Sequence, residues 1–203
     1  KPNPIKYGKK SDEIVHETAS PLLPKEDQKF IQQVIGSFLF YARAIDLTIL
    51  HALSAIAADQ ASPTERTMKR VHQFLDYMAT NPSAVIRYRA SDMILNVHSN
   101  ASYLSEPRAQ SQVAGHYFLG TQPHPHQPIQ INGSIFTFCG ILKCVVASAA
   151  EAELAALFLN CKEAKIIRLI LTELGHAQPS TPIHCDNKTA TGIANNTVKK
   201  QQS

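Results

Sequence analysis

Glu153 has a position in the sequence that could support metal chemistry. It lies in a long predicted helix, and at 100° per residue it falls within about 40° of Leu157, Ala164 and Leu171 around the helix axis. A carboxylate on such an apolar face usually needs a bound cation or a basic partner to compensate for its burial. The spacing therefore makes Glu153 a candidate metal ligand, with a purely structural carboxylate as the alternative.

The neighbouring acid, Glu151, has a simpler explanation. It lies about 160° away from Glu153 around the predicted helix. Ser148-Ala149-Ala150-Glu151 fits a capping box, in which the glutamate accepts a hydrogen bond from the amide of the capping residue. Glu151 is therefore left out of the candidate site.

Asp186 and Asn100 both follow predicted strands. Asp186 stands directly after a strand predicted over 181–185 and directly before a predicted helix. Ligands gather at the carboxyl ends of strands in open α/β sheets, but an aspartate before a helix is also a common N-cap. Asn100 has a comparable position at the end of the first strand of the sheet, where an asparagine is ordinarily a turn residue. By themselves these positions leave both interpretations open.

Three helices are predicted in the first part of the chain. Apolar residues recur at three- and four-residue steps from Phe30 to Leu39, which predicts a helix over about 24–44, and a second follows over about 47–58. Ser62-Pro63-Thr64-Glu65 combines a capping residue, a proline at the first helical position and a glutamate three residues after the cap. This pattern predicts a third helix, which ends at Asn81-Pro82. Helices of this size with short links predict a small bundle-like module.

The period of the apolar residues changes at Ala84. Alternating segments rich in β-forming residues predict strands, and a long helix that ends at Gly175 follows four of them. The predicted strands cover 84–89, 93–99, 112–119, 134–142 and 181–185, and the predicted helices cover 148–175 and 187–198. From Met93 the order is therefore β-β-β-α-β-α, which indicates an α/β layer.

The composition excludes several classes of protein. Of the 203 residues, 44% are apolar and 18% are charged, which is typical of a globular chain and not of a disordered one. The net charge of +4 suits contact with phosphate without demonstrating it. The four cysteines have no CxxC pairing and the N-terminal segment has no apolar signal region, so we expect a reduced, intracellular protein that does not span a membrane.

Four segments in the second half of the chain occur in an order specific to one family. They are HSNASYLSEP, AGHYFLG, ASAAEAELAAL and ELGHAQPSTPIHCDN. Together they resemble the ribonuclease H domain of copia-type LTR retrotransposon Pol polyproteins. The preceding segments FIQQVIGSFLFYARAID and PTERTMKRVHQFLDYMAT resemble the part that joins the reverse transcriptase to that domain. The resemblance covers roughly residues 20–198.

The resemblance implies an α/β fold in which a ribonuclease H-like mixed sheet with flanking helices follows a small helical module. It divides the chain into an extended arm (1–20), a helical connection module of a reverse transcriptase (21–83) and a ribonuclease H-like domain (84–203). Its implied partners are an RNA–DNA hybrid and the remaining reverse transcriptase portion of the polyprotein, with no membrane. The implied location is cytoplasmic, in a virus-like particle.

The implied activity is cleavage of the RNA strand of an RNA–DNA hybrid, with two Mg²⁺ or Mn²⁺ ions about 4 Å apart. Carried over by position, the family's first carboxylate falls on Asn100, its helix glutamate on Glu153 and its strand aspartate on Asp186. Asn100 is neutral, and the chain reaches VKKQQS before a further acidic ligand appears, so we expect the domain to be C-terminally incomplete. We therefore expect weak metal binding at Glu153 and Asp186, and little or no nuclease activity.

Two other interpretations stay open. A non-catalytic module could keep the nucleic-acid surface of the fold and contact phosphates through Arg108, Lys143 and Lys188. A structural fragment would serve only as part of a larger polyprotein, and an unpaired sheet edge would then favour oligomerisation. Salt-sensitive binding without cleavage would indicate the first, and the absence of binding at low salt would indicate the second.

Overall fold

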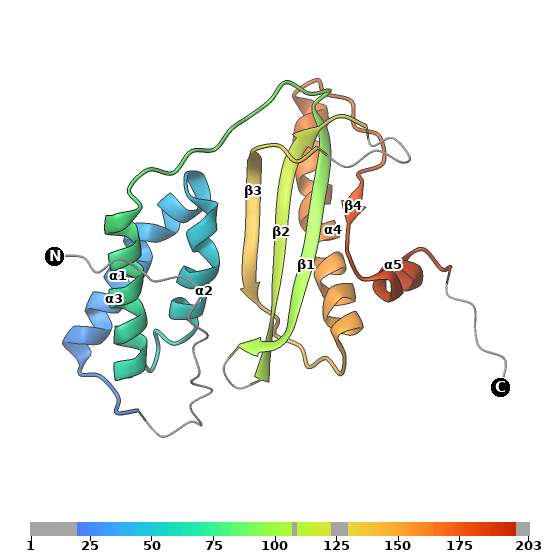
Figure 1. Ribbon diagram of the computed structural model, residues 1–203. Coiled ribbons are helices and arrows are strands. Elements are labelled where there is room, and N and C mark those ends of the chain that lie inside the picture. The colour runs from blue at the N-terminus through green and yellow to red at the C-terminus, as the bar shows by residue number, and fades with distance from the viewer. Residues whose placement is uncertain (1–19, 107–108, 123–129, 198–203) are drawn as a thin grey trace, which may run out of the picture. The chain divides into compact units, whose positions relative to one another are not determined.

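The computed structural model describes residues 20–106, 109–122 and 130–197 (Figure 1). The chain divides into two compact units, one up to Val85 and one from Ile86 onward. The predicted arm lies outside the described residues apart from Ser20, and so does Arg108. None of the helices in the described ranges is both long and apolar enough to cross a membrane.

The first unit is helical. Helix α1 covers Lys25–Ala44, the 3₁₀ helix η1 covers Leu47–Ile49, and α2 and α3 cover Leu50–Ala58 and Glu65–Thr80. The three predicted helices are confirmed. Most of their buried side chains are apolar, and these include Ile31, Val34, Ile35, Leu53, Ile56, Val71 and Phe74. Phe38 packs edge to face against Phe74, with ring centroids 5.0 Å apart, so α1 and α3 share one core.

The start of α3 differs from the prediction. Its N-cap is Thr64, not Ser62, and the capping box is closed by Thr67, whose hydroxyl accepts a hydrogen bond from the Thr64 N–H at 3.1 Å. Pro63 cannot be the first helical residue, because its carbonyl accepts a hydrogen bond from the N–H of Leu23 at 2.9 Å. Because of this contact, the chain is still extended at Pro63, and the helix begins two residues later than the predicted cap at Ser62 implies.

The second unit is a four-stranded mixed sheet with flanking helices, consistent with the predicted ribonuclease H-like fold (Figure 1). Its elements are β1 (Ile94–Glu106), β2 (Gln110–Gly120), β3 (Ser134–Ile141), α4 (Ala149–Glu173), β4 (Ile183–His184) and α5 (Lys188–Ala194). The strand order is β3-β2-β1-β4, in which β4 runs parallel to β1 and the other pairs are antiparallel. The predicted order from Met93 is confirmed.

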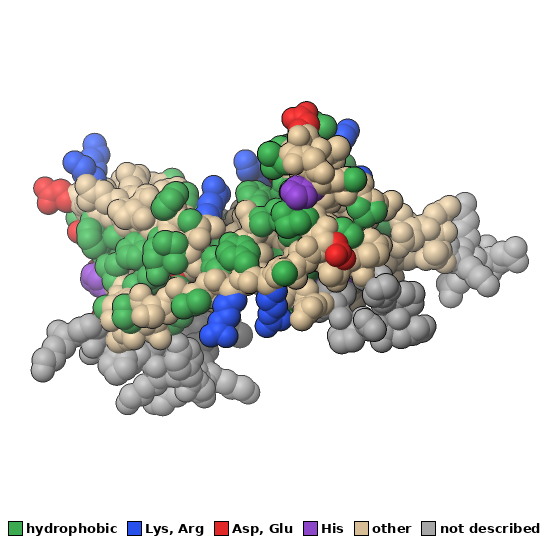
Figure 2. All heavy atoms as spheres, turned by 90° about the horizontal axis from the view of Figure 1, so that it is seen from above, with side chains coloured by type: hydrophobic (Ala, Val, Ile, Leu, Met, Phe, Trp, Pro, Cys, Tyr) green, Lys and Arg blue, Asp and Glu red, His purple; other side chains and the backbone are tan. Residues whose placement is uncertain are grey.

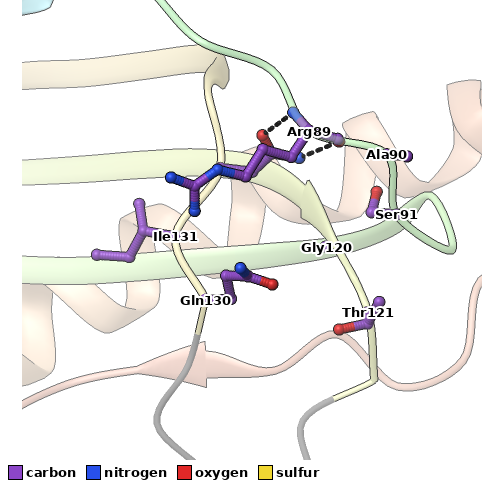
Figure 3. A pocket seen from close by; sticks show the side chains of 8 residues that line it. Arg89, Ala90, Ser91, Gly120, Thr121, Gln130 and Ile131 are labelled. Atoms are coloured by element: carbon purple, nitrogen blue, oxygen red, sulfur yellow. Dashed lines mark hydrogen bonds between the residues drawn. The ribbon is translucent and has the colours of Figure 1, made fainter.

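The predicted strand over 84–89 is wrong. These residues form no strand, and Arg89 is attached to the β2–β3 connection by the side chain of Asn132 (Figure 3). The Arg89 N–H donates to Asn132 Oδ1 at 2.7 Å, and Asn132 Nδ2 donates to the Arg89 carbonyl at 2.9 Å. One asparagine thus satisfies the backbone groups that a neighbouring strand would otherwise pair. The cavity beside this contact has a volume of only about 20 Å³, enough for roughly one water molecule.

Helix α4 packs on one face of the sheet, where alternate residues of β1 point toward it. The buried cluster between them contains Leu95, Val97, Tyr117, Ala164 and Leu171. The helix ends as predicted, because Gly175 follows the C-cap with φ +91° and the His176 N–H donates to the Leu171 carbonyl at 2.9 Å.

A buried polar network lies at the centre of this packing. Asn160 of α4 is fully buried, and its Oδ1 accepts a hydrogen bond from the Tyr117 hydroxyl at 2.6 Å. Its Nδ2 donates to Ser99 Oγ of β1 at 2.9 Å and to the Ala114 carbonyl of β2 at 3.0 Å. A Cβ on Gly115 would lie 2.1 Å from Asn160 Oδ1, so only glycine fits there. The amide therefore joins α4 to both central strands.

We predict that Asn160→Ala lowers the free energy of unfolding by about 3 kcal/mol, because the buried Tyr117 hydroxyl loses its partner and a small cavity forms. Urea denaturation followed by circular dichroism measures the change. Lys165→Ala, at an exposed position of the same helix, is the control and should change stability by less than about 0.5 kcal/mol. Equal effects of the two substitutions would contradict the role given to Asn160.

Candidate functional site

Glu153 is held in the first turns of α4. The helix begins at its predicted cap, because Ser148 Oγ accepts a hydrogen bond from the Glu151 N–H at 3.2 Å. The Glu151 carboxylate accepts from the Ala147 N–H at 2.7 Å, one residue before the amide that the capping box predicts. Glu153 points to the opposite side and is only 6% exposed, which confirms the predicted burial.

Asp186 lies two residues after the end of β4, because the strand ends at His184, where its parallel pairing with His98 of β1 also ends, and not at the predicted residue 185. The N-cap of α5 is the next residue, Asn187, whose Oδ1 accepts a hydrogen bond from the Ala190 N–H at 3.0 Å. The alternative role of Asp186 as an N-cap is therefore wrong. Its side chain is exposed at the carboxyl end of the strand, where ligands gather in α/β sheets.

The two predicted carboxylates converge, together with a thiol. One oxygen each of Glu153 and Asp186 and the sulfur of Cys185 lie within 4.8 Å of one another. Glu153 Oε1 accepts a hydrogen bond from the Ala101 N–H of β1 at 2.9 Å, and Cys185 Sγ donates to Glu153 Oε2 at 3.6 Å. We call Glu153, Cys185 and Asp186 the acid–thiol cluster. Its donor atoms suit a divalent cation.

Asn100 is the residue of β1 directly before Ala101, whose N–H binds Glu153. It is exposed, and its backbone pairs with Ala114 of β2. Its neighbours Ser99 and Ala101 point toward α4, since Ser99 bonds to Asn160 and Ala101 packs in the cluster beside α4. By alternation the Asn100 side chain lies on the opposite face of β1. The pairing of β1 with β4 ends two residues before Asn100, at His98.

The carboxyl group of Glu153 is difficult to ionise. Burial raises its pKa, and the nearby Asp186 carboxylate raises it further, while the hydrogen bond from the Ala101 N–H acts in the opposite direction. Burial also raises the pKa of the Cys185 thiol. Among the residues that the structure describes, the one ion pair joins Arg70 and Asp59 in the first unit. No basic side chain in that part of the chain therefore compensates Glu153.

Cys185 is the member of the cluster that the sequence analysis missed. The four cysteines have no CxxC pairing, so no zinc-site motif in the sequence singles out Cys185. The signal that could have found Cys185 is its position immediately before Asp186, at the end of a strand predicted to carry ligands. A metal site built across strand and helix needs no such motif, because its ligands come from separate elements.

The residues predicted to bind phosphates belong to different elements of the second unit. Lys143 stands between β3 and α4, and Lys188 is the first residue of α5; both are exposed. Arg108 lies outside the described residues. A role of these side chains in binding nucleic acid stays a prediction.

The helical unit contains a larger hollow, of about 460 Å³, between α2 and α3. Its lining is mainly apolar and includes Ile49, Ile56, Phe74 and Tyr77, with Arg70 and His51 as its basic side chains. No carboxylate is among the described residues that line it. The acid–thiol cluster is therefore the better candidate for chemistry.

One known protein is similar to most of the chain. It is the Retrovirus-related Pol polyprotein from transposon TNT 1-94 of Nicotiana tabacum, 23% identical over 164 residues. This similarity supports a retrotransposon Pol origin. The match covers 81% of this chain but only 12% of the tobacco protein, so the chain corresponds to a small part of such a polyprotein. No family model and no solved structure matched the chain.

We predict that the raised pKa of Glu153 makes stability fall with rising pH. The folded state holds this proton above the ordinary pKa of 4.5, whereas the unfolded state releases it, so the folded state loses stability as the pH rises from 4.5 through the raised pKa. Glu153→Gln removes the titration and can still accept the hydrogen bond from Ala101. The stability of the wild type relative to Glu153→Gln, measured by urea denaturation in EDTA, should therefore decrease across this range. A relative stability that increases with pH would contradict the assignment.

Proposed function

We propose that the unit from Ile86 onward is a ribonuclease H-like domain of a retrotransposon Pol polyprotein, whose family cleaves the RNA strand of RNA–DNA hybrids. One observation carries the proposal: the carboxylates of Glu153 and Asp186 converge close to the carboxyl end of β4, the edge strand of a mixed β sheet. The similarity to the tobacco Pol polyprotein supports the retroelement context.

The chemistry needs anionic ligands at one small volume. Bound divalent cations, Mg²⁺ or Mn²⁺, would activate water and stabilise the leaving oxygen of the scissile phosphate. Glu153 and Asp186 would hold them, since carboxylate oxygens are the ligands that these ions prefer. The Ala101 N–H would orient the Glu153 carboxylate through Oε1, and Oε2, which accepts only the weak hydrogen bond from Cys185 Sγ, would face the cation.

Asn100 would impair this reaction. It occupies the position at which the resemblance implies a third carboxylate, and a neutral amide offers one carbonyl oxygen where an aspartate offers two anionic ones. If a lost ligand costs about 3 kcal/mol of transition-state stabilisation, cleavage slows by a factor of about 100. We therefore propose weak or absent cleavage by the chain with Asn100.

A second candidate is a non-catalytic module that binds an RNA–DNA hybrid. The neutral Asn100 favours it, because loss of one acid lowers the negative charge that a phosphate backbone would meet. The exposed Lys143 and Lys188 could then contact phosphates. This candidate requires salt-sensitive binding in the absence of cleavage.

The remaining reverse transcriptase portion of the polyprotein is the protein partner that we propose. Figure 2 shows hydrophobic side chains, in green, spread over the face of the molecule seen from above. Large apolar residues stay exposed in both units, including Phe40, Val85, Val145, Phe158 and Leu174. Exposure of this extent supports contact with further parts of a larger protein.

We predict that Asn100→Asp increases cleavage of a labelled RNA–DNA hybrid in Mg²⁺ by about 100-fold, because it supplies the missing carboxylate. Asn195→Asp adds the same charge at an exposed position after α5 and should leave cleavage unchanged. Glu153→Gln, combined with Asn100→Asp, should remove the gained activity.

Two results would count against this proposal. Robust cleavage by the wild-type chain would show that Asn100 does not impair the site. No cleavage by Asn100→Asp in either Mg²⁺ or Mn²⁺, with salt-sensitive retention of the hybrid, would favour the non-catalytic module.

A further inference from the structure

Helix α4 has apolar side chains on the side that faces away from the sheet. Its inner side packs on β1 and β2 (Figure 1). On its outer side Ile166, Leu169 and Ile170 are 57%, 61% and 52% exposed. A helix with an apolar stripe usually packs that stripe against another element, and a contiguous exposed patch of this kind marks an interaction site. The outer side of α4 is therefore a candidate docking surface.

Four exposed residues form a line along this outer side. Lys162, Ile166, Leu169 and Glu173 follow one another at spacings of four, three and four residues. At 100° per residue they fall within about 60° of one another around the helix axis. This is the spacing with which helices pack side by side in bundles and coiled coils. We call these four residues the outer seam of α4.

The charges at the two ends of the outer seam have opposite signs and no partner in the described part of the chain. Lys162 lies over the Phe158 ring, with Nζ 5.9 Å from its centroid, and forms no ion pair among the described residues. Glu173 likewise forms none there. The two apolar residues of the seam lie between these charges, so the seam has an apolar centre with a cation at one end and an anion at the other.

Such a seam is complementary to a second copy of itself. When two helices run antiparallel about a two-fold axis midway along the seam, Lys162 of each copy lies opposite Glu173 of the other. Ile166 then lies opposite Leu169 at the centre. A parallel pair would place like charges opposite one another, which is unfavourable. We propose that the outer seam of α4 is the interface of a homodimer in which the two α4 helices pack antiparallel.

This interface leaves the acid–thiol cluster accessible. Glu153 lies on the inner side of α4, where Oε1 accepts a hydrogen bond from the Ala101 N–H of β1. The outer seam begins nine residues later, on the opposite side of the helix. A two-fold axis repeats each contact of the seam, which helps a short interface to associate. The dimer therefore does not depend on the proposed nuclease, and each can be tested without the other.

The first test measures the association of the full chain in a reducing buffer, which excludes disulfide-linked dimers through the exposed Cys144 and Cys161. Sedimentation equilibrium should show a monomer–dimer equilibrium with a dissociation constant of about 10 µM, since the seam is shorter than a standard interface. Ile166→Glu brings like charges together at the centre and should weaken the dimer by at least about 10-fold. Ile131→Glu makes the same change at an isoleucine that is 55% exposed between β2 and β3, and should have no effect.

Two results of this test would overturn the proposal. One is a wild-type chain that stays monomeric at about 100 µM, ten times the expected dissociation constant. The outer side of α4 would then be left for another part of the polyprotein. The other is an equal effect of Ile166→Glu and Ile131→Glu, which would indicate association through a different surface.

A second test exchanges the charges at the ends of the outer seam. Lys162→Glu and Glu173→Lys should each weaken the dimer by about 10-fold, because each change turns two attractive pairs into repulsive ones. The double variant restores opposite charges across the axis and should return the dissociation constant to within about 3-fold of the wild type. Only the antiparallel arrangement predicts this recovery, so a double variant as weak as the single ones would overturn it.

A third test uses the wild-type chain alone. Lys162 and Glu173 lie about 16 Å apart along one helix, too far to be joined directly within a chain. A water-soluble carbodiimide, which couples an amine to a carboxylate without a spacer, should therefore join these two residues only between copies. Mass spectrometry of the cross-linked dimer should identify a peptide that contains both. A dimer without this cross-link would overturn the arrangement.

Discussion

The buried amide of Asn160 is the interaction on which the second unit depends. It connects α4 to Ser99 of β1 and to Tyr117 and the Ala114 carbonyl of β2, with every partner at hydrogen-bond distance. A polar group without water must be fully paired, so only one position of the helix on the sheet satisfies it. Glu153 lies two helical turns before Asn160 on the same face, and the network therefore also directs its carboxylate toward Ala101.

The burial of Glu153 makes negative charge in the acid–thiol cluster unfavourable. The carboxylate is buried without a basic partner in the described part of the chain, so its ionised form depends on the Ala101 N–H and on any cation that binds there. Asp186 adds a second negative charge nearby, which makes the site without metal less favourable. A neutral Asn100 lowers this repulsion, which favours the fold at the expense of binding two cations.

Several features of the second unit could be predicted from the sequence. The predictions that failed did so for physical reasons. Periodicity predicted the helices, because an amphipathic pattern of 3.6 residues has few other solutions. It failed at 84–89, since alternation shows that a segment can be a strand but not that a neighbour is available to pair with it. It also extended the last helix to 198, whereas Asn196 has φ +54° and α5 ends at Ala194.

The sequence by itself determined the order of the elements, the burial of Glu153 and the position of Asp186 at a strand end, because these follow from local periodicity and chain order. Only the tertiary structure decided that Asn187 and not Asp186 caps α5, and that Cys185 lies 3.6 Å from Glu153. Both depend on how β4 pairs beside β1 and how α4 crosses the sheet. Contacts between residues 32 positions apart are set by packing, which local patterns do not encode.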